Sequence, residues 1–248
     1  MMNIAQYLDS TYLKTPEQSG LSAEETLQKD KDLAQEAIDN KIFAVMIRPD
    51  YVYEIKKYIQ ERNSNVVVGT VIGFHEGTYS INEKIAEAEK AIADGADELD
   101  FVINYNAYLK GELDLVKEEF VKCTQLCMQH HKIAKWIIEI AALNDDQIAD
   151  LTKNISNWAK ENFSENEWPK IFVKSSTGFF ETENGKPNGA TFEGIKIMLD
   201  NAGELPVKAA GGVRTPEDAE KMISMGVKRI GTSSALALIK NKSSEEGY

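Results

Sequence analysis

Two lysines of this sequence lie in short apolar segments that run into glycine: Lys174 in IFVKSSTGFF (171–180) and Lys208 in VKAAGGVR (207–214). Apolar, β-branched and aromatic residues closed by glycine are typical of buried strands, so each ammonium group would lie beside the core. If the two strands were neighbours, mutual repulsion and burial would lower the pKa of at least one amine towards neutrality. A neutral lysine amine is a nucleophile that forms imines with carbonyl compounds. The alternative for either lysine alone is a stem that follows apolar surface while the ammonium stays in water.

An aspartate occupies a third apolar segment, ELDFVIN (98–104), where Asp100 is flanked by hydrophobic residues. A buried carboxylate needs a partner, and a lysine is the obvious one. A purely structural ion pair is the alternative interpretation. We expect Asp97 and Glu98, at the start of this segment, to face solvent.

Glycines follow both lysines and suggest a site for an anion. Gly211 and Gly212 would let the backbone approach a ligand closely, and exposed N–H groups there suit a phosphate. Plain turn formation is the alternative for this pair.

Strand-like and helix-like segments alternate eight times along the chain, with no break in composition that would mark a linker. The expected strands are 8–13, 43–48, 66–74, 98–104, 135–141 (with Glu139 in its middle), 171–176, 207–212 and 229–234. The expected helices are 2–7, 23–40, 50–62, 81–94, 112–130, 144–162, 191–202, one that opens at Thr215 and Pro216, and a last one that ends near 241. Ser22 with Glu25, and Ser80 with Glu83, have the spacing of capping boxes.

This alternation predicts an α/β fold with a single (β/α)₈ TIM-barrel domain over residues 1–248, a short N-terminal helix and a flexible polar tail at 241–248. A doubly wound open sheet is the alternative. In a barrel the chemistry lies at the C-terminal ends of the strands, and Asp100, Lys174 and Lys208 all lie towards those ends. Lys174 and Lys208 would then lie on adjacent strands, about 4.8 Å apart.

Composition narrows the class of protein. The 248 residues are 42% hydrophobic and 27% charged, with a formal net charge of −12, which disfavours nucleic-acid binding. No apolar run reaches the roughly 20 residues of a membrane span, and the N-terminus does not resemble a signal peptide, so we expect a cytoplasmic protein.

The cysteines, Cys123 and Cys127, are expected to be reduced packing residues. The histidines, His75, His130 and His131, make no zinc-like set, and we expect neither metal nor cofactor.

At the level of whole segments the sequence resembles the deoxyribose-phosphate aldolases. The matching segments are LDSTYLK (8–14), GTVIGF (69–74), AIADGADELDFVINYNA (91–107), WIIEIAAL (136–143), FVKSSTGF (172–179), GAT (189–191), VKAAGGVRTPEDA (207–219) and RIGTSSA (229–235). The resemblance implies a cofactor-free class I aldolase, EC 4.1.2.4, acting in deoxyribonucleotide catabolism. It would cleave 2-deoxy-D-ribose 5-phosphate reversibly to acetaldehyde and D-glyceraldehyde 3-phosphate.

The resemblance also implies roles for individual residues. Lys174 would form the Schiff base with C1, Asp100 would relay protons through a water, and Lys208 would lower the pKa of Lys174 and help the relay. The expected substrate-binding residues, most of them at the phosphate, are Thr11, Gly178, Gly211, Gly212, Ser233 and Ser234. For the two serines, simple helix capping is the alternative.

The sequence departs from the family pattern at a few positions. Phe179 stands where some members have a lysine, residues 46–48 (Met-Ile-Arg) lack a cysteine that is frequent there, and His75 replaces a common proline. Tyr248 is a weak candidate for proton transfer, as a C-terminal tyrosine is in some members. The rival functions are a metal-dependent aldolase and a non-catalytic sugar-phosphate-binding protein. The oligomeric state is not fixed by the sequence, and a homodimer is one state that it allows.

Overall fold

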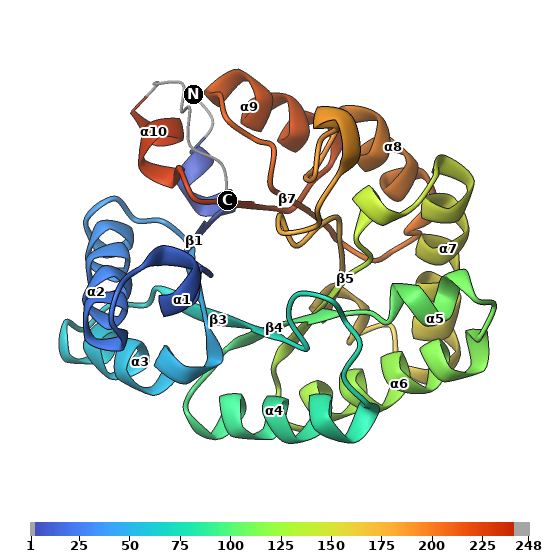
Figure 1. The fold of residues 1–248 in the computed structure, drawn as a ribbon, viewed down its shortest axis with the longest axis horizontal. Helices are drawn as coiled ribbons and strands as arrows, with labels where there is room; N and C mark the ends of the chain where they lie inside the picture. The colour runs from blue at the N-terminus through green and yellow to red at the C-terminus, as the bar shows by residue number, and fades with distance from the viewer. Residues whose placement is uncertain (1–2, 241–248) are drawn as a thin grey trace.

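The computed structural model describes residues 3–240, and within them parallel strands form a closed barrel surrounded by helices (Figure 1). Each strand pairs with the next along the chain, and the last pairs with the first. The strands are β1 (Leu8–Thr11), β2 (Ala44–Ile47), β3 (Val67–Ile72), β4 (Glu98–Val102), β5 (Ile133–Ile137), β6 (Ile171–Lys174), β7 (Val207–Ala210) and β8 (Arg229–Thr232). The predicted (β/α)₈ barrel is therefore confirmed, and the open-sheet alternative is wrong. The predicted tail 241–248 with Tyr248, and the start of the first predicted helix, lie outside the described residues.

The helices follow the predicted order, with local differences. They are α1 (Pro16–Ser19), α2 (Ala23–Asp39), α3 (Val52–Glu61), α4 (Ile81–Ala93), α5 (Tyr105–Leu109), α6 (Leu113–Gln129), α7 (Asp145–Asn162), α8 (Phe192–Asn201), α9 (Pro216–Met225) and α10 (Ala235–Ile239). Short 3₁₀ turns lie at Ile4–Tyr7, Pro49–Tyr51, Ile140–Ala142, Trp168–Lys170 and Glu183–Gly185. Both predicted capping boxes are present, at the N-termini of α2 and α4. The sequence interpretation missed α1 and α5.

The fifth strand lies earlier in the chain than predicted. β5 begins at Ile133 and ends at Ile137, so Glu139 does not lie in a strand. Instead Glu139 has φ 56° and ψ 70°, a left-handed conformation that ends the strand and opens the Ile140–Ala142 turn. A non-glycine residue in this region is uncommon, and such residues gather at functional sites.

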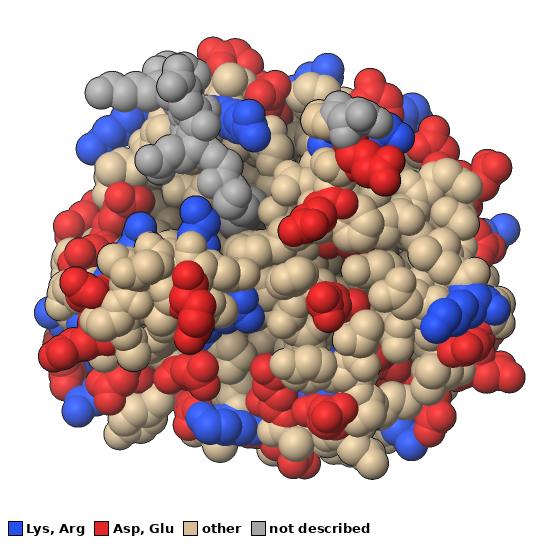
Figure 2. All heavy atoms as spheres, viewed as in Figure 1, with Lys and Arg blue, Asp and Glu red and all other residues tan. Residues whose placement is uncertain are grey.

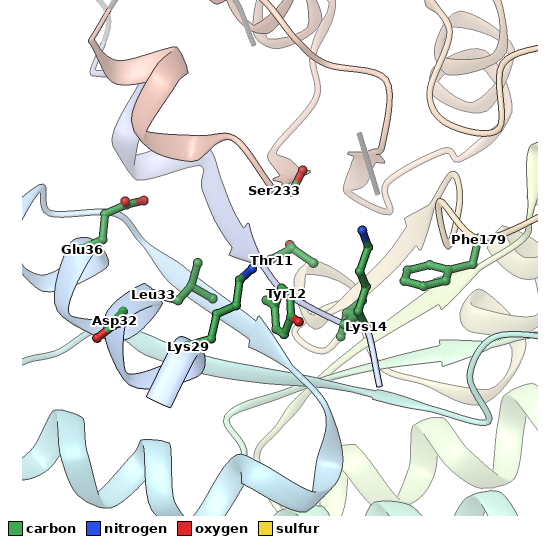
Figure 3. Close-up of a pocket in the computed structure, with 10 residues that line it drawn as sticks. Thr11, Tyr12, Lys14, Lys29, Asp32, Leu33, Glu36, Phe179 and Ser233 are labelled. Carbon is green, nitrogen blue, oxygen red and sulfur yellow. The ribbon is translucent and has the colours of Figure 1, made fainter. Parts of the chain in front are cut away.

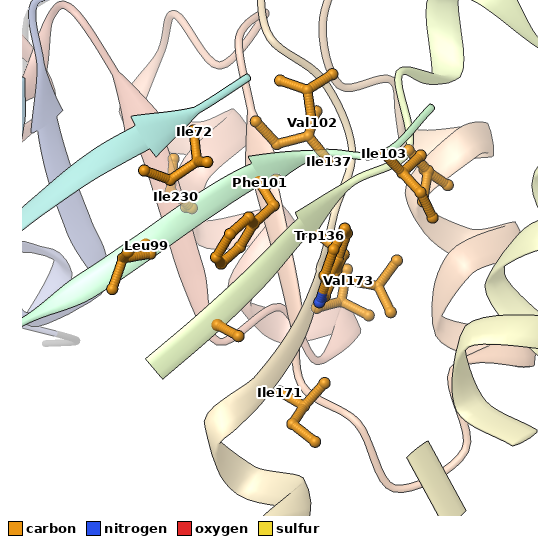
Figure 4. Close-up of a cluster of buried hydrophobic side chains, with 14 of the residues drawn as sticks. Ile72, Leu99, Phe101, Val102, Ile103, Trp136, Ile137, Ile171, Val173 and Ile230 are labelled. Atoms are coloured by element: carbon orange, nitrogen blue, oxygen red, sulfur yellow. The ribbon is translucent and has the colours of Figure 1, made fainter. Parts of the chain in front are cut away.

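Alternation along β4 explains how the barrel separates its apolar and charged side chains. Leu99 and Phe101 pack into the hydrophobic layer under the helices, where Phe101 stacks on Trp136 with ring centroids 5.0 Å apart (Figure 4). Glu98 and Asp100 lie on the opposite face of the strand and pair with cations of other barrel strands. The expectation that Glu98 faces solvent is wrong, since it is buried, whereas Asp97 is partly exposed and paired with Lys56.

Two further predictions concern the state of the cysteines and the absence of membrane-spanning segments. Cys123 and Cys127 are free thiols buried on α6, and burial raises the pKa of Cys123 to about 12, so they act as packing residues. Within residues 3–240 there is no helix both long and apolar enough to span a bilayer.

Candidate active site

Lys174, Lys208 and Asp100 meet inside the barrel. β6 and β7 are neighbours, and their register pairs Lys174 with Lys208 directly. The Nζ atoms of both lysines donate to Oδ2 of Asp100, each at 2.8 Å. All three residues are buried, and Lys174 retains 4% of its surface exposed. The predicted juxtaposition of two amines and one carboxylate is therefore present.

Behind this trio the barrel interior holds a closed ring of ion pairs. Asp100 pairs with Lys208 (2.8 Å) and Lys135 (2.7 Å), and Lys208 also pairs with Asp9 (2.6 Å). Arg229 then links Asp9 to Glu98, and Glu98 pairs with Lys135 at 2.6 Å, which closes the ring. The six side chains come from β1, β4, β5, β7 and β8, so they connect strands far apart in the sequence.

The formal charges of the six ring residues sum to zero, so a protonated Lys174 gives the buried cluster one excess positive charge. Asp9, Glu98 and Asp100 carry three negative charges, and Lys135, Lys208 and Arg229 carry three positive ones. Lys174 attaches to this ring only through an oxygen of Asp100 that Lys208 already shares. Losing the proton of Lys174 therefore leaves the buried cluster neutral, which a low-dielectric interior favours.

The direction of each pKa follows from this arrangement. Burial, together with repulsion from Lys208, lowers the pKa of Lys174 to about 8 against the attraction of Asp100. Burial works in the same sense on Lys208, but Asp100 and Asp9 outweigh it and raise its pKa. Burial would raise the pKa of Asp100, yet Lys135, Lys174 and Lys208 hold it well below its usual range. For Asp9 burial is likewise outweighed, by Arg229 and Lys208, and its pKa falls to about 2. The amine that becomes neutral near physiological pH is thus Lys174.

A second buried carboxyl lies beside the turn that follows β6. Oε2 of Glu139 accepts hydrogen bonds from the N–H and the hydroxyl of Thr177, at 3.1 and 2.5 Å. The Thr177 hydroxyl oxygen in turn accepts from the N–H of Phe179. Burial raises the pKa of Glu139 to about 7, although the Thr177 hydrogen bonds and the nearby Lys174 lower it. Glu139 therefore holds the turn that contains Gly178.

The glycines predicted to bind phosphate differ in whether their backbone N–H groups already donate a hydrogen bond within the described chain. Gly178, Gly211 and Gly212 all have positive φ, at 82°, 69° and 75°, which explains glycine at these positions. The N–H of Gly211 donates to the carbonyl of Gly231 and is occupied, whereas those of Gly178 and Gly212 make no hydrogen bond within residues 3–240. A Cβ on Gly212 would lie 2.7 Å from the carbonyl oxygen of Ala190, so close backbone packing also requires glycine there.

Ser233, Ser234 and Thr11 lie at the C-terminal ends of β8 and β1. The N–H of Ser234 donates to the Thr232 hydroxyl and is occupied, whereas that of Ser233 makes no hydrogen bond within the described chain. The helix α10 begins directly after Ser234, as predicted, but the Ser234 side chain makes no capping hydrogen bond, so simple capping does not describe this serine. The hydroxyl of Thr11 donates to the backbone carbonyl of Asp9 at 2.9 Å.

Two hollows open beside these residues. One of about 530 Å³ is lined by Thr11, Tyr12, Leu13, Lys14, Lys29, Asp32, Leu33, Glu36, Phe179 and Ser233 (Figure 3). The other, of about 580 Å³, is lined by Lys14, Gln18, Gly178, Phe179, Phe180, Glu181, Thr182 and Asn188. Lys14 and Phe179 belong to both and form their common wall.

The positions that depart from the family pattern contact one another. His75 stacks on Phe179 with ring centroids 5.7 Å apart, and Phe74 meets Phe179 edge to face at 5.1 Å. The guanidinium of Arg48 lies 4.8 Å from the centroid of the Phe74 ring. Met46 packs under the same group. These departures therefore form one aromatic cluster beside the hollows.

Several residues of the site were not singled out from the sequence. They are Asp9, Lys135 and Arg229, which complete the ring with Glu98, and Glu139, which lies after β5 and not in it. Asp9 and Lys135 carried the same signal as Lys174, a charged residue within an apolar strand segment. In the described part of the chain no three His, Cys, Asp or Glu side chains gather as metal ligands would.

Comparison with known proteins gives consistent similarities over nearly the full chain. Residues 4–241 match a family model described as DeoC/LacD family aldolase. The deoxyribose-phosphate aldolase of Caldicellulosiruptor saccharolyticus is 37% identical over 238 residues, which cover 95% of this chain and 96% of that protein. The deoxyribose-phosphate aldolase of Thermococcus gammatolerans is 37% identical over 246 residues, which cover 99% of both. A solved tetrameric deoxyribose phosphate aldolase from Aeropyrum pernix has a TM-score of 0.75 at 26% identity, covering 96% of this chain and 89% of that one.

Proposed function

Because this chain belongs to the DeoC/LacD family of aldolases, we propose that it cleaves 2-deoxy-D-ribose 5-phosphate to acetaldehyde and D-glyceraldehyde 3-phosphate through an imine on Lys174. The observation that carries the proposal is the charge balance around Lys174. A buried amine attached to an already neutral ring, with a pKa of about 8, is a nucleophile at physiological pH. We also propose that the reaction serves deoxyribonucleotide catabolism and takes place in the cytoplasm.

The proposed reaction begins at the Lys174 amine. Its lone pair adds to the C1 aldehyde of the open-chain sugar, and the resulting carbinolamine takes a proton supplied through Asp100 and Lys208 and loses water to give the protonated imine. The C3 hydroxyl then gives its proton to the relay formed by Asp100 and Lys208, the C2–C3 bond breaks, and the electron pair of that bond moves to the iminium nitrogen. This releases D-glyceraldehyde 3-phosphate and leaves an enamine, which takes a proton at C2 and is hydrolysed to acetaldehyde and free Lys174.

Asp100 and Lys208 are the groups that we assign to proton transfer. Two carboxylates flank Lys208 and raise its pKa, so it starts protonated and can donate this proton and recover it through Asp100. Asp100 contacts both amines, so a proton can pass between them without a large movement of either side chain. For the phosphate we propose the amides of Gly178, Gly212 and Ser233, with Thr11 beside them, whereas the amides of Gly211 and Ser234 support the turns.

Reduction with borohydride in the presence of 2-deoxy-D-ribose 5-phosphate tests the function. The protein should gain covalent mass at Lys174 and lose activity, and Lys174→Ala should show neither adduct nor cleavage. Lys170→Ala is the matched control, since Lys170 precedes β6 at the opposite end of the same strand. Substantial turnover by Lys174→Ala, or an adduct on another lysine, would rule out the proposal. A non-catalytic sugar-phosphate-binding protein would bind the sugar without any adduct, and a metal-dependent aldolase would lose activity with EDTA.

A further inference from the structure

The hollow beside β1 contains two lysines that the proposed reaction does not use. Lys14 follows β1 in the loop to α1, and Lys29 lies on α2. Neither makes an ion pair within residues 3–240. The chain has a formal net charge of −12, and Figure 2 shows Asp and Glu side chains spread over the face in view. On a protein with this net charge, a lysine without an ion pair beside a proposed anion site is available to bind an anionic ligand.

Lys14 lies between the residues proposed to hold the phosphate. One hollow that it lines contains Thr11 and Ser233, and the other contains Gly178. Figure 3 shows the Lys14 side chain between those of Ser233 and Phe179. Backbone amides carry partial charge and cannot neutralise a phosphate dianion, so a full positive charge at this point adds to what they supply.

The loop that carries Lys14 is fixed to the barrel. Nε of Arg48 donates to the carbonyl of Leu13 at 2.7 Å, and the Leu13 side chain packs with Met46, Val71, Phe74 and Phe179. The aromatic cluster around Phe179 therefore holds the residue immediately before Lys14. The ammonium is carried by a preorganised segment rather than by a free loop tip.

Lys29 differs from Lys14 in two respects. Its ammonium lies 4.6 Å from the centroid of the Tyr12 ring, a cation–π distance, and it lines only the first hollow. Asp32 and Glu36 line the first hollow from α2, the helix that carries Lys29, and Glu181 lines the second hollow with Lys14.

We propose that Lys14 is a specificity-determining residue that binds the 5-phosphate of the substrate from its place between the two hollows. This rests on the proposed function. Lys14→Met should raise KM for 2-deoxy-D-ribose 5-phosphate about tenfold and lower the preference for the phosphorylated over the unphosphorylated sugar by the same factor. Inhibition by inorganic phosphate should weaken in parallel, and Lys14→Arg should restore most of the preference.

Lys29→Met is the matched control, because it removes an equal charge from the same hollow. Its preference for the phosphorylated sugar should stay within about twofold of the parent protein. An unchanged preference in Lys14→Met, or an equal loss in both variants, would overturn the assignment to Lys14. Failure of the underlying function has a different signature: the parent protein would then form no borohydride-trapped adduct at Lys174 with either sugar.

Discussion

Lys174 and Lys208 donate to the same oxygen atom, Oδ2 of Asp100, from adjacent residues of neighbouring strands. One carboxylate oxygen therefore serves two amines, and the two amines differ in what else surrounds them. Lys208 has Asp9 as a second counter-charge, whereas Lys174 has no other carboxylate at ion-pair distance within the described residues. The asymmetry explains why burial lowers the pKa of one lysine while the pKa of its neighbour rises.

Lys208→Leu should raise the pKa of Lys174 above its value of about 8. The substitution removes a repelling charge and leaves Oδ2 of Asp100 to Lys174 alone, and both effects favour the protonated amine. Because the nucleophile is the neutral amine, the pH at which borohydride trapping reaches half its maximum should rise, by about one unit. Near-ultraviolet circular dichroism should show that the variant is folded, since Asp9 retains Arg229. A pH profile unchanged from that of the parent protein contradicts the coupling of the two lysines.

Glu98→Gln should shift the same profile in the opposite direction. Glu98 belongs to the ring but contacts neither Lys174 nor Lys208, and its loss leaves the buried cluster with excess positive charge. The protonated form of Lys174 is then less stable, and its pKa should fall by some tenths of a unit up to about one unit. Glu89→Gln, the same change at an exposed position of α4, should leave the profile in place. Equal shifts in the two variants would mean that total charge, not the ring, sets the pKa.

Glu139→Gln should flatten the dependence of stability on pH. Burial raises the pKa of Glu139 to about 7 from its ordinary value of 4.5. The neutral carboxyl is therefore the form that suits the fold, so its contribution is complete below pH 4.5 and is lost as pH rises through 7. The parent protein should lose up to about 3 kcal/mol more free energy of unfolding between pH 4.5 and pH 8 than the variant does. Urea unfolding of both proteins across this range provides the test, and parallel curves would contradict it.

Lys84→Met should destabilise the protein without touching the proposed chemistry. The buried ammonium of Lys84 pairs with Glu119 at 2.5 Å and donates to the carbonyls of Gly77 and Val102. Removing it leaves the Glu119 carboxylate buried without a counter-charge, which costs about 3–5 kcal/mol in the free energy of unfolding. Lys122→Met breaks an exposed pair with Glu118 and should cost less than about 1 kcal/mol. A loss from Lys84→Met no larger than the loss from Lys122→Met would contradict this account.

The sequence was most informative where a charged residue interrupts an apolar strand. Lys174, Lys208 and Asp100 were found in this way, and the alternation of strands and helices made the barrel predictable. The same reasoning applied to Glu98 would have placed it in the interior, since residues two apart on a strand share a face with Asp100. The position of Glu139 could not be predicted in this way. Its left-handed backbone goes with the turn and the Thr177 contact and does not follow from local propensity.

The interactions that join segments distant in the sequence could not be predicted from the sequence either. Nothing in the segments around Arg48 and Leu13 indicates that the guanidinium of one holds the backbone of the other. Likewise the ring partners Asp9 and Arg229 lie 220 residues apart in the chain and meet only because β8 pairs with β1.

That last pairing has a consequence for the newly synthesised polypeptide. A chain that has left the ribosome only as far as β7 already contains both lysines and their shared aspartate, but not the arginine that links Asp9 to Glu98. Until the final strand docks, Asp9 and Glu98 lack that counter-charge, and the excess negative charge of the incomplete cluster favours the protonated form of Lys174. On the function proposed above, the neutral form of Lys174 would thus be favoured only once β8 completes the barrel.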